Sequence, residues 1–353
     1  MSEINTPEEI KNKIKVLRFK HTKAPRDMAV CNELAFLSYL VGDGKSAEKY
    51  WRKILELGND DPYVHANLGT VLCESGKLSE AQKHYLVALK KIPTDITLHN
   101  NLAALLCDTN RHDEAETYHR KALELQPNDP QNLYHLAALL INRQKLEEAE
   151  QLLRKITQID PKFIESFIFL ARLLADTQRP DEALQTYKQA ISLNTQNASL
   201  YHEIGFYLHR LGKYEEARSN YNKAIYYFPH EAIYFYDLGN TLVALKLYEE
   251  AETNYRKTLQ LNPKCYNAAY HLGQLHLLRG SLHTAIEHFS SVIHQAPKHY
   301  LAYNYLATIY LKLPQPQTQN AIQLLQIACE LQPDFEPARK NLAFAQRLKE
   351  QED

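Results

Sequence analysis

Residues 65–81, HANLGTVLCESGKLSEA, run an apolar stretch with a Leu-Gly pair into Gly76, after which a second helical pattern begins at once. Thirty-four residues later, residues 99–115 read HNNLAALLCDTNRHDEA and follow the same design position by position. Self-similarity at a fixed period indicates a repeat architecture, so it has to be tested before domains are counted.

The period extends through most of the 353 residues. Eight units of 34 residues follow one another without a gap, and a ninth, residues 300–335, carries two extra residues in LPQPQTQ. We expect an N-terminal capping helix within residues 1–27, nine units in residues 28–335 and a C-terminal solvating helix in residues 336–353. The predicted units start at residues 28, 62, 96, 130, 164, 198, 232, 266 and 300.

Within each unit, small and large residues fall at fixed positions. Positions 8 and 20 are Gly or Ala, which lets two helices approach closely, and position 24 is usually aromatic and fills the space beside them. Glycine at position 15 suits a turn with positive φ, and Asn110 suits it too. Proline at position 32 ends the second helix. The glycines at position 15 are Gly42, Gly76, Gly212 and Gly280.

With these residues the chain resembles a tetratricopeptide repeat (TPR) protein, over roughly residues 28–350. The departures are local, for example His119 and Leu153 where the aromatic residue of position 24 is expected. The resemblance implies an all-α fold: a right-handed superhelical solenoid of antiparallel helix pairs, in which the first helix of each pair lines a concave groove.

The same geometry implies which side chains face the groove. In the early units they are small and polar, and in units four to nine they are aromatic with amide and imidazole neighbours, which suits peptide recognition. An alternative is that several tyrosines pack between helices. The predicted partner-binding residues are Asn67, Asn101, Tyr134, His135, Phe169, Arg172, His202, Phe206, Arg210, Tyr236, Asn240, Tyr270, His271, Gln274, Asn304 and Tyr305.

The N-terminal segment predicts a helix that starts with Thr6 as N-cap and Pro7 at the first helical position. We expect this helix to cover the first unit, and a membrane- or partner-binding amphipathic helix is the alternative. It carries an apolar stripe of Ile10, Ile14 and Leu17 and a basic stripe of Lys11, Lys15 and Arg18.

Composition excludes several classes of function. The net charge is −1, which argues against bulk nucleic-acid binding. The five scattered cysteines form no CxxC pair, so no structural zinc site is expected, and the i,i+5 histidine pairs do not share a helix face. No catalytic or cofactor-binding motif occurs, so we expect no enzyme, no metal and no cofactor. No apolar run is long enough to span a membrane, and a reducing, cytoplasmic setting is expected.

The leading hypothesis is a non-enzymatic scaffold that binds a segment of a partner protein in its concave groove, chiefly in units four to nine. A structural or assembly subunit that acts through the convex face or by self-association is the second, and a homo-oligomer is compatible with it. An accessory subunit of a glycosyltransferase-like enzyme is the third, suggested by Asn67 and Asn101 alone.

Overall fold

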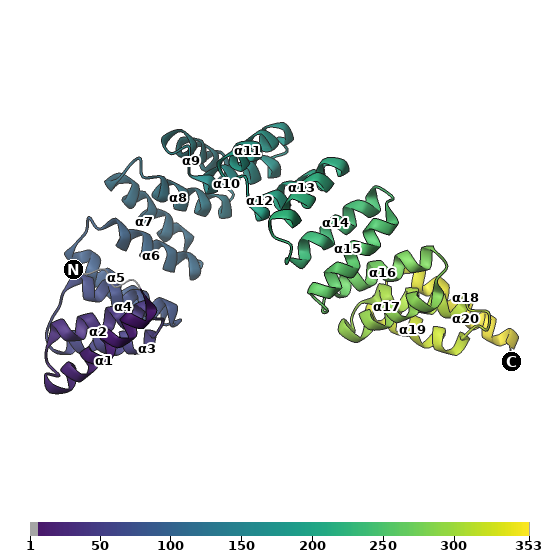
Figure 1. Ribbon diagram of the computed structural model, residues 1–353, viewed down its shortest axis with the longest axis horizontal. Helices are drawn as coiled ribbons and strands as arrows, with labels where there is room; N and C mark the ends of the chain where they lie inside the picture. Colours follow the sequence, from purple (N-terminus) through teal and green to yellow (C-terminus); the bar gives the residue numbers. More distant parts are fainter. Residues whose placement is uncertain (1–5, 353) are drawn as a thin grey trace. The chain divides into compact units, whose positions relative to one another are not determined.

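The computed structural model describes residues 6–352, and within that range all regular structure is helical. Helices of 13 and of 14 residues alternate over most of the chain and pack in consecutive pairs (Figure 1). The first helices of the pairs are α2 (Met28–Leu40), α4 (Pro62–Glu74), α6 (Ile96–Asp108), α8 (Pro130–Asn142), α10 (Ile164–Asp176), α12 (Ala198–Arg210), α14 (Ala232–Ala244), α16 (Tyr266–Leu278) and α18 (Tyr300–Lys312).

The second helices of the pairs run from α3 to α19, and α1 and α20 lie at the two ends. The second helices are α3 (Gly44–Glu56), α5 (Leu78–Lys91), α7 (His112–Leu125), α9 (Leu146–Ile159), α11 (Pro180–Leu193), α13 (Tyr214–Tyr227), α15 (Tyr248–Leu261), α17 (Leu282–Gln295) and α19 (Thr318–Leu331). The end helices are α1 (Pro7–Lys23) and α20 (Glu336–Glu352). Each of the nine first helices begins at the start of a predicted unit, and the assignment of the whole chain to nine units and two caps remains our proposal.

The chain forms two compact units, which divide between Thr186 and Tyr187 within α11. The first unit holds α1 to α10, and the second holds α12 to α20. Along residues 6–352, no helix combines the length and the apolar character that crossing a membrane requires.

Side-chain caps fix where the early first helices begin. Asp27, Asp61, Asp95 and Asp129 each accept a hydrogen bond from a backbone N–H in the first turn of the helix that follows. These caps satisfy donors that the helix leaves without partners. At the chain's start Thr6 and Glu9 form a complete capping box, so the predicted N-cap is confirmed.

Left-handed turns join the two helices of a pair at position 15. Gly42, Gly76, Gly212 and Gly280 all have φ between 73° and 78°, and Asn110 has φ 59°, as expected. Three residues that the sequence did not single out adopt the same conformation, namely Gln144, Gln178 and Lys246. The backbone at this position is therefore set by the helix pair around it.

Glycine at position 8 has a steric role within the pairs. A Cβ atom on Gly239 would lie 2.7 Å from the ring of Tyr255, and one on Gly69 would lie equally close to Tyr85. Real Cβ atoms do not approach carbon this closely, so these rings occupy the space that a methyl group would need. The pairs with His119 or Leu153 at position 24 carry alanine at position 8, and alanine also accompanies the large rings of Trp51 and Tyr187.

Neighbouring pairs of the first unit are also joined by ion pairs at a spacing of 29 residues. Glu48 accepts from Lys77 at 2.8 Å, Glu116 from Lys145 at 2.9 Å and Glu150 from Arg179 at 2.8 Å. Glu116 is buried and its carboxylate meets two arginines as well as Lys145. A buried carboxylate without these partners would be costly, so the ion pairs hold successive pairs in one register.

Candidate protein-interaction surface

A hydrogen-bonded chain of side chains runs across three successive first helices of the second unit. The Tyr236 hydroxyl of α14 lies 3.3 Å from His271 Nε2 on α16. His271 Nδ1 lies 3.0 Å from Gln274 Oε1, and Gln274 Nε2 donates to the hydroxyls of Tyr270 at 3.2 Å and Tyr305, on α18, at 3.3 Å. Five of the predicted partner-binding residues are thus brought together.

The acceptors in this chain fix the direction of the hydrogen bonds. Because Gln274 Oε1 can only accept, His271 Nδ1 must carry the proton, and neutral Nε2 then accepts from the Tyr236 hydroxyl. The amide of Gln274 supplies the donors for Tyr270 and Tyr305. These two hydroxyls can bond to each other, so one of their O–H groups remains to donate to an outside acceptor such as a peptide carbonyl.

Burial shifts the ionisation of these groups. It lowers the pKa of His271 and raises the pKa values of Tyr236 and Tyr270. Each shift favours the neutral form, since a low-dielectric environment penalises charge. The chain of hydrogen bonds therefore stays uncharged around neutral pH, and it offers dipoles to a ligand.

At several junctions, position 6 of one pair contacts position 24 of the preceding pair. His271 stacks on Tyr255 at 5.3 Å between ring centroids and 19°, and Tyr305 stacks on Phe289 at 5.3 Å and 3°. The Tyr187 hydroxyl donates to Glu203 at 2.8 Å, which is a hydrogen bond between the same two repeat positions, 24 and 6. Residues 16 apart in sequence therefore form the contact between successive pairs.

Sequence reasoning missed Asp237 and the position-24 rings as parts of this surface. His202 Nε2 lies 2.7 Å from Asp237 Oδ2, and both side chains are partly buried. The signal was present in the sequence as pairs at spacings of 16 and 35 residues. It becomes readable only when position 6 of one pair is compared with positions 5 and 24 of the pair before it.

Among the predicted partner-binding residues of the second unit, two on α12 are the most accessible to solvent. Phe206 is 48% exposed, and Arg210, one turn later, is exposed as well. Arg210 forms no ion pair with any other residue that the structure describes. An exposed ring and a cation at i and i+4 lie on the same face of a helix.

Three of the predicted residues are committed to internal contacts. Tyr270 is only 9% exposed and packs edge-on against Phe289. Asn304 is buried and accepts a hydrogen bond from Asn341 of α20 at 2.9 Å. Asn240 accepts from the Tyr255 hydroxyl at 2.8 Å.

The predicted residues of the first unit form a smaller group. Tyr134 of α8 contacts Phe169 of α10 edge-on at 4.9 Å, and the Arg172 guanidinium lies 5.6 Å from the Phe169 ring centre. His135 stacks on His119 at 5.9 Å and 15°. Burial, together with the charge of nearby His135, lowers the pKa of His119 to about 4.

Asn67 and Asn101 are not part of this group. Asn67 is exposed on α4 and Asn101 is half-buried on α6, and the side chains of both lack a hydrogen bond to the rest of the described chain. The structure does not extend the short asparagine ladder beyond these two residues, because His135 follows at the same position.

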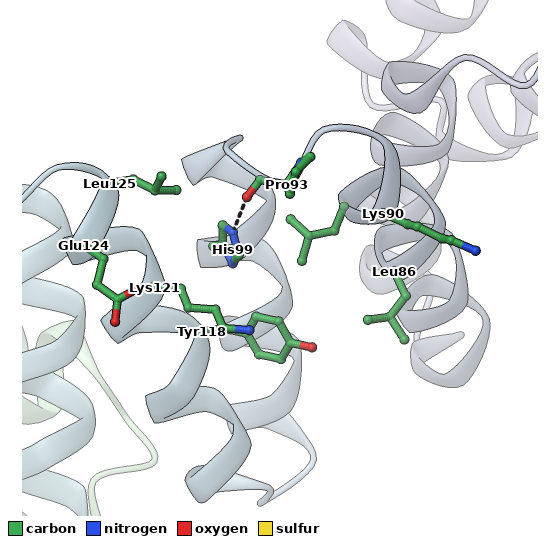
Figure 2. Close-up of a pocket in the computed structure, with 9 residues that line it drawn as sticks. Leu86, Lys90, Pro93, His99, Tyr118, Lys121, Glu124 and Leu125 are labelled. Atoms are coloured by element: carbon green, nitrogen blue, oxygen red, sulfur yellow. Dashed lines mark hydrogen bonds between the residues drawn. The ribbon is translucent and has the colours of Figure 1, made fainter.

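A separate pocket of about 470 Å³ lies among α5, α6 and α7, and its lining includes none of the predicted partner-binding residues (Figure 2). Leu86 and Pro93 border it on one side, Tyr118 and Leu125 on the other, and buried His99 lies between them. It is an apolar hollow with charged residues at its rim. The rim residues are Lys90, Lys121 and Glu124.

His99 differs from the histidine at the same position of the preceding pair. His99 Nε2 donates to the Pro93 carbonyl at 2.9 Å, whereas its Nδ1 is buried without a partner. In α4, His65 uses both nitrogens, one toward Asp60 at 2.9 Å and the other toward His84 at 2.8 Å. Tyr118 replaces His84 in the next pair, which removes the second partner.

Within the part of the chain that the structure describes, no group of three or more His, Cys, Asp or Glu side chains is placed to hold a metal ion. The cysteines at position 12, Cys73 and Cys107, are partly buried, and burial raises the pKa of both thiols. They pack as small uncharged side chains.

Comparison with known proteins matches this geometry. Models described as "Tetratricopeptide repeat" match residues 106–173, 196–264 and 236–299, and one described as "TPR repeat" matches residues 171–212. Together they span residues 106–299, which is more than half of the chain. The chain belongs to the tetratricopeptide repeat family, whose members bind protein or peptide partners.

Solved structures show the same fold. The C-terminal part of a TPR repeat-containing protein from Cytophaga hutchinsonii is 20% identical, with a TM-score of 0.59, and the match covers 68% of this chain and 98% of that one. PilF from Pseudomonas aeruginosa is 19% identical, with a TM-score of 0.51, over 61% of this chain and 96% of its own.

YrrB, described as a TPR protein with an unusual peptide-binding site, is 25% identical over 53% of this chain and 96% of its own, with a TM-score of 0.46. No curated protein matches the chain.

Proposed function

We propose that the chain is a non-enzymatic scaffold that binds an extended segment of a partner protein along the first helices α12, α14, α16 and α18 of its second unit. The observation that supports this most is the hydrogen-bonded chain from Tyr236 to Tyr305, which presents uncharged donors beside aromatic rings. Tyrosine and amide groups bury area while they keep polar contacts, as binding sites for peptides require.

The side chains of the proposed binding face have different roles. Phe206 supplies an exposed apolar anchor and Arg210 a cation, whereas His271 and Gln274 hold the phenol groups in fixed orientations. Side chains that are already held in place lose little entropy when a ligand binds. The face therefore suits a segment with one apolar side chain, an acidic residue nearby and backbone carbonyls along its length.

The test is capture of partners from native lysate by the intact chain and two double variants. Phe206→Ala/Arg210→Ala removes the exposed anchor and the cation of α12 without touching a buried side chain. Tyr226→Ala/Lys223→Ala removes an exposed ring and a cation from α13 and is the matched control. Circular dichroism establishes that all three proteins are equally folded.

The proposal predicts a protein that the intact chain and the α13 control capture and that the α12 variant loses. Equal capture by all three would contradict it. Loss in the α13 control alone would transfer the binding activity to the second helices and favour the assembly role. Tyr270 is unsuitable for this test, because its burial against Phe289 means that alanine would also loosen the packing.

A further inference from the structure

The outward face of α1 is apolar and basic at the same time. Ile14 and Leu17 are buried against α2, and the opposite side of the helix carries Val16, which is 56% exposed, and Phe19, which is 62% exposed. A helix that served only as a cap would be expected to present a polar outer face. The exposed valine and phenylalanine are not explained by the packing of the repeats.

The positive charge of α1 lies beyond its first turn. The only acidic residues of the helix, Glu8 and Glu9, lie in its first turn, and six lysines and arginines follow. Of these, Lys13 pairs with Glu33 at 2.5 Å, and Arg18 lies 3.7 Å from Asp43. The other four are exposed and form no ion pair within residues 6–352; they are Lys11, Lys15, Lys20 and Lys23.

Helical geometry places these side chains in an ordered pattern. At 100° per residue, Val16, Phe19 and Lys23 share the side opposite Ile14 and Leu17. Lys20 lies on one flank of this apolar centre, and Lys11 and Lys15 lie on the other. The Lys23 ammonium lies 4.5 Å from the Phe19 ring centre, so this cation contacts the exposed ring of the apolar centre.

We propose that this face of α1 binds the surface of an anionic phospholipid bilayer, with the helix in the plane of the interface. Phe19 and Val16 would enter the boundary between headgroups and acyl chains, and the four lysines would contact lipid phosphates and carboxylates. The site is separate from the proposed peptide-binding face and does not depend on it.

Charge complementarity and shape favour lipid over an acidic protein. The chain as a whole has a net charge of −1, so the four unpaired lysines on one helix are a local excess and not a general property of the surface. The face is the outward surface of one helix. A bilayer surface accepts such a helix directly, whereas a protein partner would need a groove built around it.

The other terminal helix provides a natural control. Phe344 of α20 is 59% exposed, close to the value for Phe19. α20 carries four lysines and arginines against three glutamates, and Lys340 pairs with Glu336 at 2.7 Å. An exposed phenylalanine is therefore common to both ends of the chain, and the surplus of lysines is particular to α1.

The test is sedimentation of the full chain with vesicles of phosphatidylcholine alone or with about a third phosphatidylserine. Neutralising the four lysines should weaken binding to the anionic vesicles by roughly fivefold for each lysine, and more than a hundredfold together. Phe19→Ser should weaken it by about tenfold, whereas Phe344→Ser should leave it unchanged. The charge-matched control carries Lys83→Gln, Lys90→Gln, Lys264→Gln and Lys298→Gln.

The proposal predicts salt-sensitive binding to anionic vesicles that the charge-matched control retains. Absence of binding by the intact chain, or equal binding to neutral vesicles, would overturn it. Equal loss in the charge-matched control would also overturn it, since net charge and not α1 would then be responsible. Binding to soluble polyglutamate without binding to vesicles would assign the face to an acidic protein instead.

Discussion

Two junctions between helix pairs use the same repeat positions for different purposes. In the first unit, Ala103 and His119 occupy positions 8 and 24 of one pair, and His135 of the next pair stacks on His119. In the second unit, Gly239 faces Tyr255, on which His271 stacks at nearly the same angle.

The difference lies in what each stacked histidine touches next. Within residues 6–352, the hydrogen bond of His135 is to Gln131 of its own helix, whereas His271 joins Tyr236 of the preceding helix to Gln274. The smaller ring at position 24 thus accompanies a junction in which the stacked histidine makes no hydrogen bond to the preceding helix among the described residues; there Asn100 of α6 donates to Asn132 of α8 at 2.6 Å instead. A larger ring accompanies a junction whose polar atoms are ordered, and that is the junction we assign to binding.

The largest expected effect is the response of the first junction to acid. The pKa of His119 is about 4 in the folded chain and near 6.5 when unfolded, so the folded state resists protonation. The contribution of neutral His119 to the free energy of unfolding is fully present above pH 6.5. It falls as the pH drops toward 4, and the loss reaches about 3 kcal/mol. Thermal melts should show Tm falling over this window, by about 6–10 °C.

His119→Leu, which copies Leu153 at the same position, should flatten this pH dependence, because leucine does not titrate. His230→Gln changes an exposed histidine and serves as the control. An unchanged drop in Tm in the His119→Leu variant would show that His119 is not the residue responsible.

The second prediction exchanges the small residue of the junction. Gly239→Ala places a Cβ atom 2.7 Å from the Tyr255 ring, which Asn240 and His271 hold in place. Overpacking should outweigh the gain in helix propensity of about 1 kcal/mol and leave a net loss of about 2 kcal/mol in urea unfolding.

A double-mutant cycle sharpens this exchange. In a Tyr255→His background, which copies the Ala103–His119 pair, Gly239→Ala should become neutral or stabilising because the smaller ring leaves room. The same loss in both backgrounds would mean that the ring does not set the residue at position 8.

Much of this arrangement could be predicted from the sequence. The small residues at positions 8 and 20, the aromatic residues at 24 and the turns at Gly76 and Asn110 follow from steric rules that act within one helix pair, and the family and the all-helical fold are confirmed. The left-handed turn at Lys246 could not be read locally, because docking of the two helices overrides the preference of that residue.

The surface residues were harder to predict, because their contacts join different pairs. Position 6 changes from Asn101 to His135 and later His271, which looked like a failing ladder until the ring of the preceding pair was considered. The direction of the hydrogen bonds depends on Gln274, whose partners come from two helices. The burial of Tyr270 likewise depends on Phe289 of the following helix.

The third prediction concerns the affinity for the captured partner. Tyr236→Phe removes the hydroxyl that donates to His271 and leaves the ring in place, so binding measured by calorimetry should weaken by about tenfold. Tyr134→Phe is the matched change in the first unit, where the hydroxyl has no hydrogen bond to the described chain, and it should alter affinity by less than about twofold. Equal effects of the two changes on the affinity would contradict the assignment of binding to the second-unit junction.

The smallest expected effect is at the turns. Lys246 has φ 62° and Asn110 has φ 59°, so both occupy the left-handed region. Lys246→Gly should raise the free energy of unfolding by about 1 kcal/mol, because lysine is strained there. Asn110→Gly should gain only a few tenths, since asparagine tolerates this conformation. Equal gains in urea unfolding would contradict the account of the turns.

The most direct measurement of the binding assignment is site-specific photo-cross-linking in native lysate. A benzophenone side chain replaces Phe206 on α12 in one protein and Tyr226, which is 80% exposed on α13, in a second. The account predicts that the probe at position 206 cross-links a distinct partner, which an excess of unlabelled intact chain displaces, and that the probe at position 226 does not. Cross-linking of the same partner from position 226 alone would contradict binding along the first helices of the second unit.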